Sequence, residues 1–209
     1  MRAIEIDVIS DVICPWCFLG KRRLDKAISL LDGIRVEVSW RPFFLDPTIP
    51  AEGMSRRDYM ESKFGPERLK TIHDPLIAAG KADGVPYELD KILRTPNSMD
   101  AHRLIRWSHG TGQQRDVVER LFMAYWNGGL DIGDRKVLLK IADDAGMDGA
   151  AISGKFENGT DIDAVNAEVE RAYRMGVTGV PCFILAQKQG LMGAQPAEVL
   201  ADAIGKLAA

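Results

Sequence analysis

Residues 10–17 read SDVICPWC, and this stretch decides how the N-terminal part of the chain folds. An alternation of apolar and polar residues over 4–8 precedes it and predicts a strand, and the helix-forming run KRRLDKAI at 21–28 follows it. Proline is tolerated only in the first turn of a helix, so Pro15 predicts that the helix begins at or just before it. The two cysteines of the stretch therefore lie at a strand-to-helix junction.

The spacing of Cys14 and Cys17 suits a redox-active dithiol. Cys14 falls at the helix start, where unpaired backbone N–H groups and the positive end of the helix dipole favour a thiolate over a thiol. Cys17 falls on the same helical face, about 5–6 Å away. That separation suits a disulfide. We therefore expect Cys14 to be the attacking sulfur and Cys17 the resolving one.

Two other uses of the cysteine pair are less favoured. A zinc site needs a second pair of ligands, but the chain has three cysteines, and its histidines, His73, His102 and His109, show no ligand spacing. No metal is therefore expected. A permanent disulfide gains little from closing so small a loop, because the stabilisation grows with loop length.

The composition excludes several classes of function. The 209 residues are 46% hydrophobic, enough to bury a core in one large domain or in a domain with an insertion. Lys and Arg number 27 against 30 Asp and Glu, so the net charge is −3 and no nucleic-acid surface is expected. Residues 1–7 carry carboxylates where a signal peptide needs an apolar run, and no segment approaches the roughly 20 apolar residues of a membrane span. A cytoplasmic protein without membrane contact is expected, and in a reducing compartment a dithiol is more often catalytic than structural.

Beyond the first helix, strand patterns flank a long helical block. Alternation over 34–40 predicts a second strand, and residues from about 55 to 175 are predicted to be almost exclusively helical. Ser98 and Asp134 are predicted helix caps within that block. The chain then returns to two short strands and a last helix, predicted at 182–185, 191–192 and 196–207.

This order of elements predicts an α/β protein, with a thioredoxin-like fold and a large inserted α-helical domain. The thioredoxin-like domain is expected to be discontinuous, over 1–50 and 165–209. The inserted helical domain is expected over 51–164.

Together these residues resemble the DsbA-like branch of the thioredoxin superfamily, and most closely its cytosolic FrnE-type dithiol–disulfide oxidoreductases or isomerases. The motifs that carry the resemblance span the chain in a fixed order: Asp11 with CPWCFLG at 14–20, WRPF at 40–43, PNS at 96–98 with AHR at 101–103, GVTGVP at 176–181, and GAQP at 193–196. Each motif is modest alone, and their order and spacing together are specific.

The resemblance implies that Pro181 is a cis proline packed beside the dithiol. A cis bond turns the preceding backbone outward, so Val180 is expected to offer its N–H and C=O to an extended thiol substrate. Pro15 and Trp16, between the cysteines, complete the residues expected to position a substrate. The alternative is an ordinary trans proline that opens a strand.

Two positions depart from the family pattern. Many relatives carry a carboxylate six residues before the attacking cysteine, where it accepts the proton of the resolving cysteine; here that residue is Val8, and Asp7 points to the opposite strand face. Asp11 is a candidate for this proton relay, and equally a cap or turn residue. Cys182 follows Pro181 on the other face of its strand, where a small buried hydrophobe is the expected role.

Other polar and aromatic residues near these motifs are expected to be structural. Asn97 is expected to cap the helix that follows it, and His102 to be a satisfied interior histidine. The Tyr125 and Trp126 side chains are expected to pack between helices.

We expect a thiol–disulfide oxidoreductase that exchanges disulfides with protein or small-molecule thiol substrates. No bound cofactor is expected. Glutathione as a co-substrate and a homodimeric assembly are both left open. The runner-up is a glutathione-dependent isomerase or transferase of the hydroxychromene-carboxylate isomerase or kappa-class type, which has the same architecture and typically carries serine where Cys14 stands. The presence of both cysteines argues against that role. A partner-binding module without activity is a third interpretation, and no exposed apolar stripe in the sequence supports it.

Overall fold

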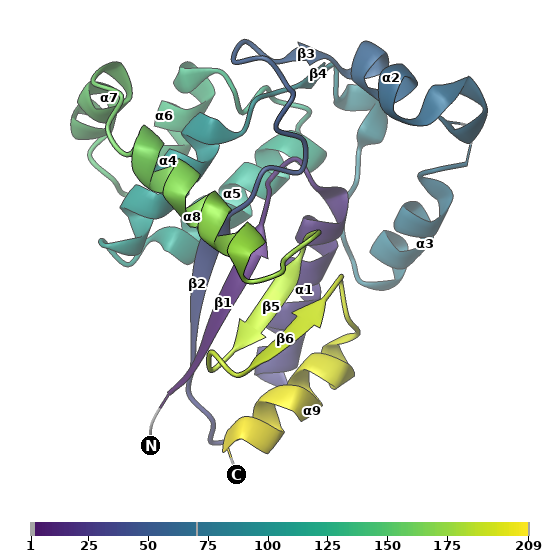
Figure 1. Ribbon diagram of the computed structural model, residues 1–209, viewed down its shortest axis with the longest axis vertical. Coiled ribbons are helices and arrows are strands. Elements are labelled where there is room, and N and C mark those ends of the chain that lie inside the picture. Colours follow the sequence, from purple (N-terminus) through teal and green to yellow (C-terminus); the bar gives the residue numbers. More distant parts are fainter. Residues whose placement is uncertain (1–2, 70, 209) are drawn as a thin grey trace.

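The computed structural model describes residues 3–69 and 71–208, and its centre is a four-stranded sheet in the order β2-β1-β5-β6 (Figure 1). β1 pairs in parallel with β2 and antiparallel with β5, and β5 pairs antiparallel with β6. Two segments from opposite ends of the chain therefore build one sheet, with β1 at an interior position. The strands are β1 (Ile4–Ser10), β2 (Val36–Pro42), β5 (Cys182–Leu185) and β6 (Gln189–Met192).

Three helices cover the two faces of this sheet, namely α1 (Pro15–Ser29), α8 (Ile162–Arg174) and α9 (Ala197–Ala208). Alternation along β1 separates the faces. Val8 is buried in the same cluster as Phe18 of α1, whereas Ile9 is buried in a second cluster with Ala172 of α8. Figure 1 shows α8 on one side of the strands and α1 and α9 on the other. This is the thioredoxin-like arrangement that the sequence predicted.

The inserted block lies between β2 and α8 in the chain. Its helices gather beside the end of the sheet at which β1 leads into α1 (Figure 1). Within the described part of the chain, no helix is both long and apolar enough to cross a membrane. The second predicted domain limit, between residues 164 and 165, falls inside α8. The helices of the block are α2 (Arg56–Leu69), α3 (Asp74–Ala82), α4 (Met99–His109), α5 (Gln114–Trp126), α6 (Arg135–Asp144) and α7 (Gly149–Glu157), with a 3₁₀ turn η1 (Leu89–Lys91).

The prediction that residues 55–175 are almost exclusively helical missed a small second sheet. It pairs β3 (Met54–Ser55) with β4 (Arg94–Thr95) in antiparallel fashion. Each strand has two residues, so no alternation of apolar and polar positions can reveal it. α2 is also interrupted, because Gly65 has a φ of 72° and Pro66 follows it.

The side-chain caps predicted at Asp134 and Asn97 are present, whereas the one predicted at Ser98 is not. The Asp134 carboxylate accepts a hydrogen bond from the backbone N–H of Lys136 at 2.9 Å, as an N-cap residue should. Ser98 is the N-cap residue of α4 but makes no side-chain cap bond. Asn97 supplies it, since its Oδ1 accepts from the N–H of Met99 at 3.0 Å.

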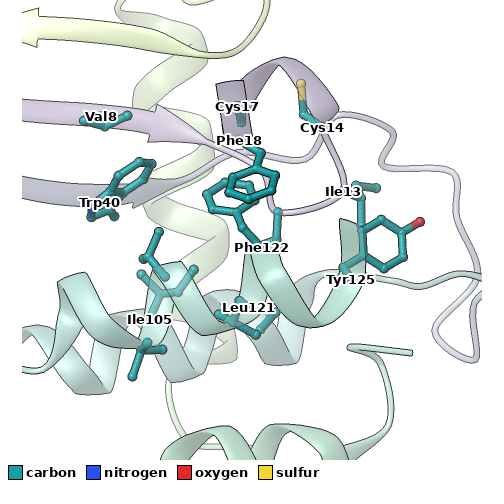
Figure 2. Packing of buried hydrophobic residues seen from close by; sticks show 14 of the residues in the cluster. Val8, Ile13, Cys14, Cys17, Phe18, Trp40, Ile105, Leu121, Phe122 and Tyr125 are labelled. Atoms are coloured by element: carbon teal, nitrogen blue, oxygen red, sulfur yellow. The ribbon is translucent and has the colours of Figure 1, made fainter. Parts of the chain in front are cut away.

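A large hydrophobic cluster joins the sheet to the inserted helices (Figure 2). Phe18 of α1 stacks on Phe122 of α5 with ring centroids 5.2 Å apart, and Trp40 of β2 meets Phe122 at 6.1 Å. Full burial of a side chain the size of Phe stabilises the fold by about 1.5–3 kcal/mol. The inserted block is therefore anchored on α1, the helix that carries the two cysteines.

Candidate active site

Cys14 lies immediately before α1, and Cys17 lies in its first turn. Cys14 is the N-cap residue, with extended φ and ψ of −90° and 115°, and Pro15 occupies the first turn as predicted. The N–H of Cys17 donates to the carbonyl of Cys14 at 3.0 Å and closes the turn between them. Both thiols are free, and their residues are buried, with exposed fractions of 2% and 0%. Figure 2 shows the Cys14 sulfur directed away from the aromatic cluster under α1.

The surroundings of Cys17 disfavour its thiolate. Burial, followed by the hydrogen bond and the charge of Cys14, raises the pKa of Cys17 well above its ordinary value. Two hydrogen-bonding groups act against this rise in pKa, the backbone N–H of Asp11 and the hydroxyl of Ser10. Burial has the largest effect on this pKa, so Cys17 stays a protonated thiol until the reaction removes its proton.

Ser10 is a site residue that sequence reasoning missed. It is the last residue of β1 and is buried. A signal for it was available, because alternation places Ser10 on the same strand face as Val8, the position where relatives carry a carboxylate. Here the polar group on that face is the Ser10 hydroxyl, two residues after Val8.

The Val180–Pro181 peptide bond is cis, as the resemblance implied. The Cys14 thiol donates to the carbonyl of Val180, with 3.6 Å between sulfur and oxygen, so this proline lies beside the dithiol. Gly20 of α1 allows the close approach, because a Cβ at Gly20 would lie 2.9 Å from Cγ of Pro181. Val180 is half-buried, at the border between the dithiol and solvent.

Trp16 stands at the solvent-exposed rim of the site. Its exposed fraction is 39%, whereas the other three tryptophans of the chain, all in its described part, are buried. A large aromatic side chain between the two cysteines therefore faces solvent.

Two side chains of the inserted block bind the main chain around the dithiol. The hydroxyl of Tyr87 donates to the carbonyl of Pro15 at 2.5 Å, and Nε1 of Trp126 donates to the carbonyl of Val12 at 2.8 Å. Burial, and after it the charges of the two cysteines, raises the pKa of Tyr87, so its hydroxyl stays a donor. Trp126 was predicted only to pack between helices. Neither hydrogen bond has a local signal, because the partners lie 72 and 114 positions apart.

Asp11 is a buried turn residue whose main chain contacts both cysteines. Its carbonyl accepts from the N–H of Cys14 at 3.1 Å, and its backbone lowers the pKa of Cys17. Its carboxylate accepts from the N–H groups of Ile13 at 3.3 Å and Leu45 at 2.8 Å. The turn role weighed for Asp11 is therefore present, and the proton relay stays a prediction.

Other residues considered from the sequence lie apart from the dithiol. Asp7 forms an ion pair with Arg41 at 2.7 Å on the opposite strand face. Cys182 is buried with Ile9 and Phe43 in the cluster on that face, and burial raises its pKa. Among residues 3–69 and 71–208, no group of three or more His, Cys, Asp or Glu side chains is placed to hold a metal ion.

Comparison with known proteins gives consistent matches along the chain. The profile of the family described as DSBA-like thioredoxin domain matches residues 5–205. A crystal structure of the probable DsbA oxidoreductase SCO1869 from Streptomyces coelicolor is similar, with 29% identity and a TM-score of 0.87 over 97% of this chain and 89% of that one. YwbO, an uncharacterized protein of Bacillus subtilis (strain 168), is 27% identical over 183 residues, which cover 87% of this chain and 86% of YwbO.

The same fold occurs in an isomerase structure. 2-Hydroxychromene-2-carboxylate isomerase has a TM-score of 0.76 and 18% identity, with coverage of 98% of this chain and 96% of the isomerase.

Proposed function

Because this chain belongs to the DSBA-like thioredoxin domain family, we propose that it is a thiol–disulfide oxidoreductase. In the proposed reaction the Cys14 thiolate attacks a substrate disulfide, forms a mixed disulfide and releases one substrate thiolate. Cys17 then gives up its proton and attacks the Cys14 sulfur, which releases the second substrate thiolate and leaves a Cys14–Cys17 disulfide. Two electrons pass to the substrate, and the reverse sequence oxidises a dithiol.

The observation that carries this proposal is the difference between the two sulfurs. Cys14 lies at the N-cap of α1, and its thiol donates to the half-buried carbonyl of Val180. Cys17 is fully buried, and its pKa is raised well above its ordinary value. A first sulfur beside the half-buried main chain of Val180 and a second sulfur fully enclosed by the fold match the attacking and resolving roles of two-step exchange.

The neighbouring residues receive roles within this proposal. Pro15, Trp16, Val180 and Pro181 surround Cys14 and are assigned to substrate positioning. An extended substrate would pair with the main chain of Val180, as an added strand does. Asp11 keeps its assignment as candidate proton relay for Cys17.

We propose proteins or small molecules with a disulfide or a dithiol as substrates. Glutathione is the proposed small thiol, and the cytoplasm, where thiols are kept reduced, is the proposed compartment.

The proposal is tested with single cysteine variants in a disulfide-reduction assay on insulin, with dithiothreitol as reductant. Cys14→Ser is expected to abolish catalysis, because the attacking sulfur is gone. Cys17→Ser is expected to accumulate a mixed disulfide on Cys14 that mass spectrometry of acid-quenched samples detects. Cys182→Ser is the matched control and should keep wild-type turnover, because Cys182 lies on the other face of the sheet.

The same variants separate the runner-up, a glutathione-dependent isomerase. Such an enzyme needs a group that activates the glutathione thiol, and it does not need a resolving sulfur. Full activity of Cys17→Ser on an aromatic oxo-acid with glutathione, together with no disulfide reduction by the wild type, would reverse the ranking.

A further inference from the structure

Arg23 of α1 bridges two segments that lie far apart in the sequence. Its Nε donates to Oδ2 of Asp83 at 2.9 Å, and Asp83 directly follows α3 of the inserted block. Its Nη1 donates to the carbonyl of Ala194 at 2.5 Å, in the connection from β6 to α9. The side chains of Arg23 and Asp83 are each 18% exposed, so solvent and salt screen their ion pair only in part. The guanidinium therefore ties α1 to the inserted block and to the connection after β6.

The Ala194 carbonyl belongs to a bend that also holds the cis proline. The chain bends at Gly193 and Ala194, directly after β6, and this pair is called the 193–194 bend below. The N–H of Gly193 donates to the carbonyl of Pro181 at 2.7 Å. Gly193 has a φ of 78°, which glycine adopts without strain. Because the two residues are adjacent, the hydrogen bond from Arg23 to Ala194 restrains the N–H on which the Pro181 carbonyl depends.

The main chain that this bend holds is the part of the site that borders Cys14. The Cys14 thiol donates to the carbonyl of Val180, the residue that the cis bond joins to Pro181. In the proposed reaction an extended substrate pairs with the main chain of Val180. α1 also approaches this segment three residues before Arg23, where Gly20 lies against the Pro181 ring. α1 thus supports the segment twice, directly at Gly20 and through the bend at Arg23.

We propose that Arg23 is a positioning residue for extended disulfide substrates, whose guanidinium holds the 193–194 bend so that the main chain of Val180 stays ready to pair with such a substrate. The inference rests on the proposed function and adds to it a residue that separates extended substrates from small ones. Arg23 acts through the bend and through no contact with either sulfur. Asp83 supports it, because Oδ2 of Asp83 accepts from both Nε and Nη2 of the guanidinium.

Loss of the guanidinium removes the donor to the Ala194 carbonyl and leaves the 193–194 bend free to shift. The hydrogen bond from Gly193 to Pro181 then weakens, and the main chain of Val180 becomes less ordered. A substrate that pairs with this main chain must order it on binding, which costs affinity. A small disulfide without a peptide chain makes no such pairing, so attack on it by Cys14 changes little.

The experiment compares two uncharged disulfides that release the same coloured product. One is an uncharged, extended peptide whose single cysteine carries a pyridylthio group, and the other is dipyridyl disulfide. Reduced protein in excess converts each of them to free thiols, while Cys14 and Cys17 are oxidised to a disulfide. For the peptide, the rate of pyridinethione release against protein concentration gives a limiting rate and a half-saturation concentration. For the small disulfide it gives a second-order rate constant.

Arg23→Met removes the donors and keeps an unbranched side chain. We expect it to raise the half-saturation concentration for the peptide about three- to tenfold, as loss of one hydrogen bond would, with a limiting rate close to that of the wild type. The rate constant for the small disulfide should not change, whereas a general loss of structure would slow both reactions. A folded Arg23→Met variant with an unchanged half-saturation concentration overturns the inference, and so does equal slowing with both disulfides.

Lys26→Met is the matched control for the lost charge. It removes a cation from the same helix together with an ion pair, because Nζ of Lys26 lies 3.5 Å from Oε1 of Glu198. This ion pair joins α1 to α9 and does not involve the 193–194 bend. Lys26→Met should therefore leave both reactions at their wild-type rates, and a rise in the half-saturation concentration equal to that of Arg23→Met would overturn the inference.

Asp83→Ala provides a second variant, which leaves the guanidinium in place without its support. It should raise the half-saturation concentration for the peptide about threefold, the lower end of the range for one hydrogen bond. If Arg23→Met does not fold, as judged by circular dichroism, Asp83→Ala decides in its place, and an unchanged value overturns the inference.

Hydrogen exchange of the Gly193 amide, followed by NMR, tests the anchoring without any substrate. Exchange should be faster in the folded variant, Arg23→Met or Asp83→Ala, than in the wild type, because the bend that presents this N–H is no longer held. Unchanged exchange in an active protein overturns the inference alone. A wild-type protein that reduces neither disulfide rejects the proposed function, and with it the substrate role of Arg23, so the two failures are distinguishable.

Discussion

The hydroxyl of Tyr87 donates to the main-chain carbonyl of Pro15, so a side chain from the inserted block holds one of the two residues between the cysteines. The Tyr87 ring packs edge-on against Phe18 of α1 and against Trp126 of α5, with centroids 5.8 and 5.9 Å apart. The start of α1 is therefore supported from outside the thioredoxin-like sheet.

Tyr87→Phe removes the donor and keeps the ring. We expect the free energy of unfolding to fall by about 0.5–1.5 kcal/mol, the usual net contribution of one hydrogen bond. Urea unfolding with an unchanged m-value measures this. Tyr173→Phe, on the exposed side of α8, is the control and should not change the free energy of unfolding. A Tyr87→Phe variant as stable as the wild type would show that the bond contributes nothing.

Ser10→Ala removes the hydroxyl that lowers the pKa of Cys17. The pKa of Cys17 should rise further, so less thiolate is present and the mixed disulfide on Cys14 should persist longer. Acid quenching followed by mass spectrometry gives its lifetime. Ser29→Ala, at the exposed C-terminal end of α1, serves as control. An unchanged or shorter lifetime in Ser10→Ala would contradict the role assigned to the hydroxyl.

The resolving step should accelerate with pH through the neutral range and beyond. The attacking species is the Cys17 thiolate, and burial holds the pKa of Cys17 above its ordinary value even when Cys14 is in a mixed disulfide and no longer contributes its charge. Below that pKa the thiolate fraction grows about tenfold per pH unit. The rate at which Cys17 releases the second substrate thiol from the mixed disulfide, measured from about pH 6 to 9, should therefore rise with pH. No plateau is expected near the ordinary thiol pKa of about 8.5. A plateau at neutral pH is the contrary result.

Gly20→Ala should disturb the contact between α1 and the proline beside the dithiol. A Cβ at this position would lie 2.9 Å from Cγ of Pro181 and 3.2 Å from Cζ of Phe183, so both groups must shift. Overpacking of this kind costs about 1–3 kcal/mol, against which alanine gains up to about 1 kcal/mol of helix propensity.

We expect lower stability and slower disulfide exchange for Gly20→Ala. Gly205→Ala in α9 is the matched control, because nothing lies within 4 Å of its added Cβ. Gly205→Ala should be as stable as the wild type or more so, with unchanged exchange. Thermal unfolding and the insulin assay compare the pair, and normal exchange in Gly20→Ala would show that the contact with Pro181 is not needed.

The parts of the structure that could be predicted from the sequence are those set by local chemistry. Pro15 determines where α1 begins, alternation of apolar residues indicates β1, and a continuous apolar run indicates the strand that begins at Cys182. The strand predicted from Ile34 begins instead at Val36, where pairing with Ile4 of β1 starts. The alternation begins two residues earlier than this pairing. Ends of elements depend on pairing partners that a local pattern does not contain.

A neighbour of the dithiol could be predicted only where its position along a strand or helix alone places it near the cysteines. Ser10 shares a strand face with Val8, so its approach to Cys17 could have been found by counting along β1. Tyr87 and Trp126 reach the dithiol segment only because the inserted helices fold back onto α1. Nothing near either residue in the sequence indicates a main-chain partner so far along the chain.

The unequal exposure of the tryptophans gives the protein an intrinsic fluorescent reporter of its own active site. Trp16 alone combines large exposure, 39%, with a position between the two cysteines. A collisional quencher such as iodide, which stays in the solvent, should therefore dim the emission of Trp16 and spare the buried indoles. A molecule docked over the dithiol would shield that emission, so occupancy of the site can be followed by light on the unlabelled, unmodified chain.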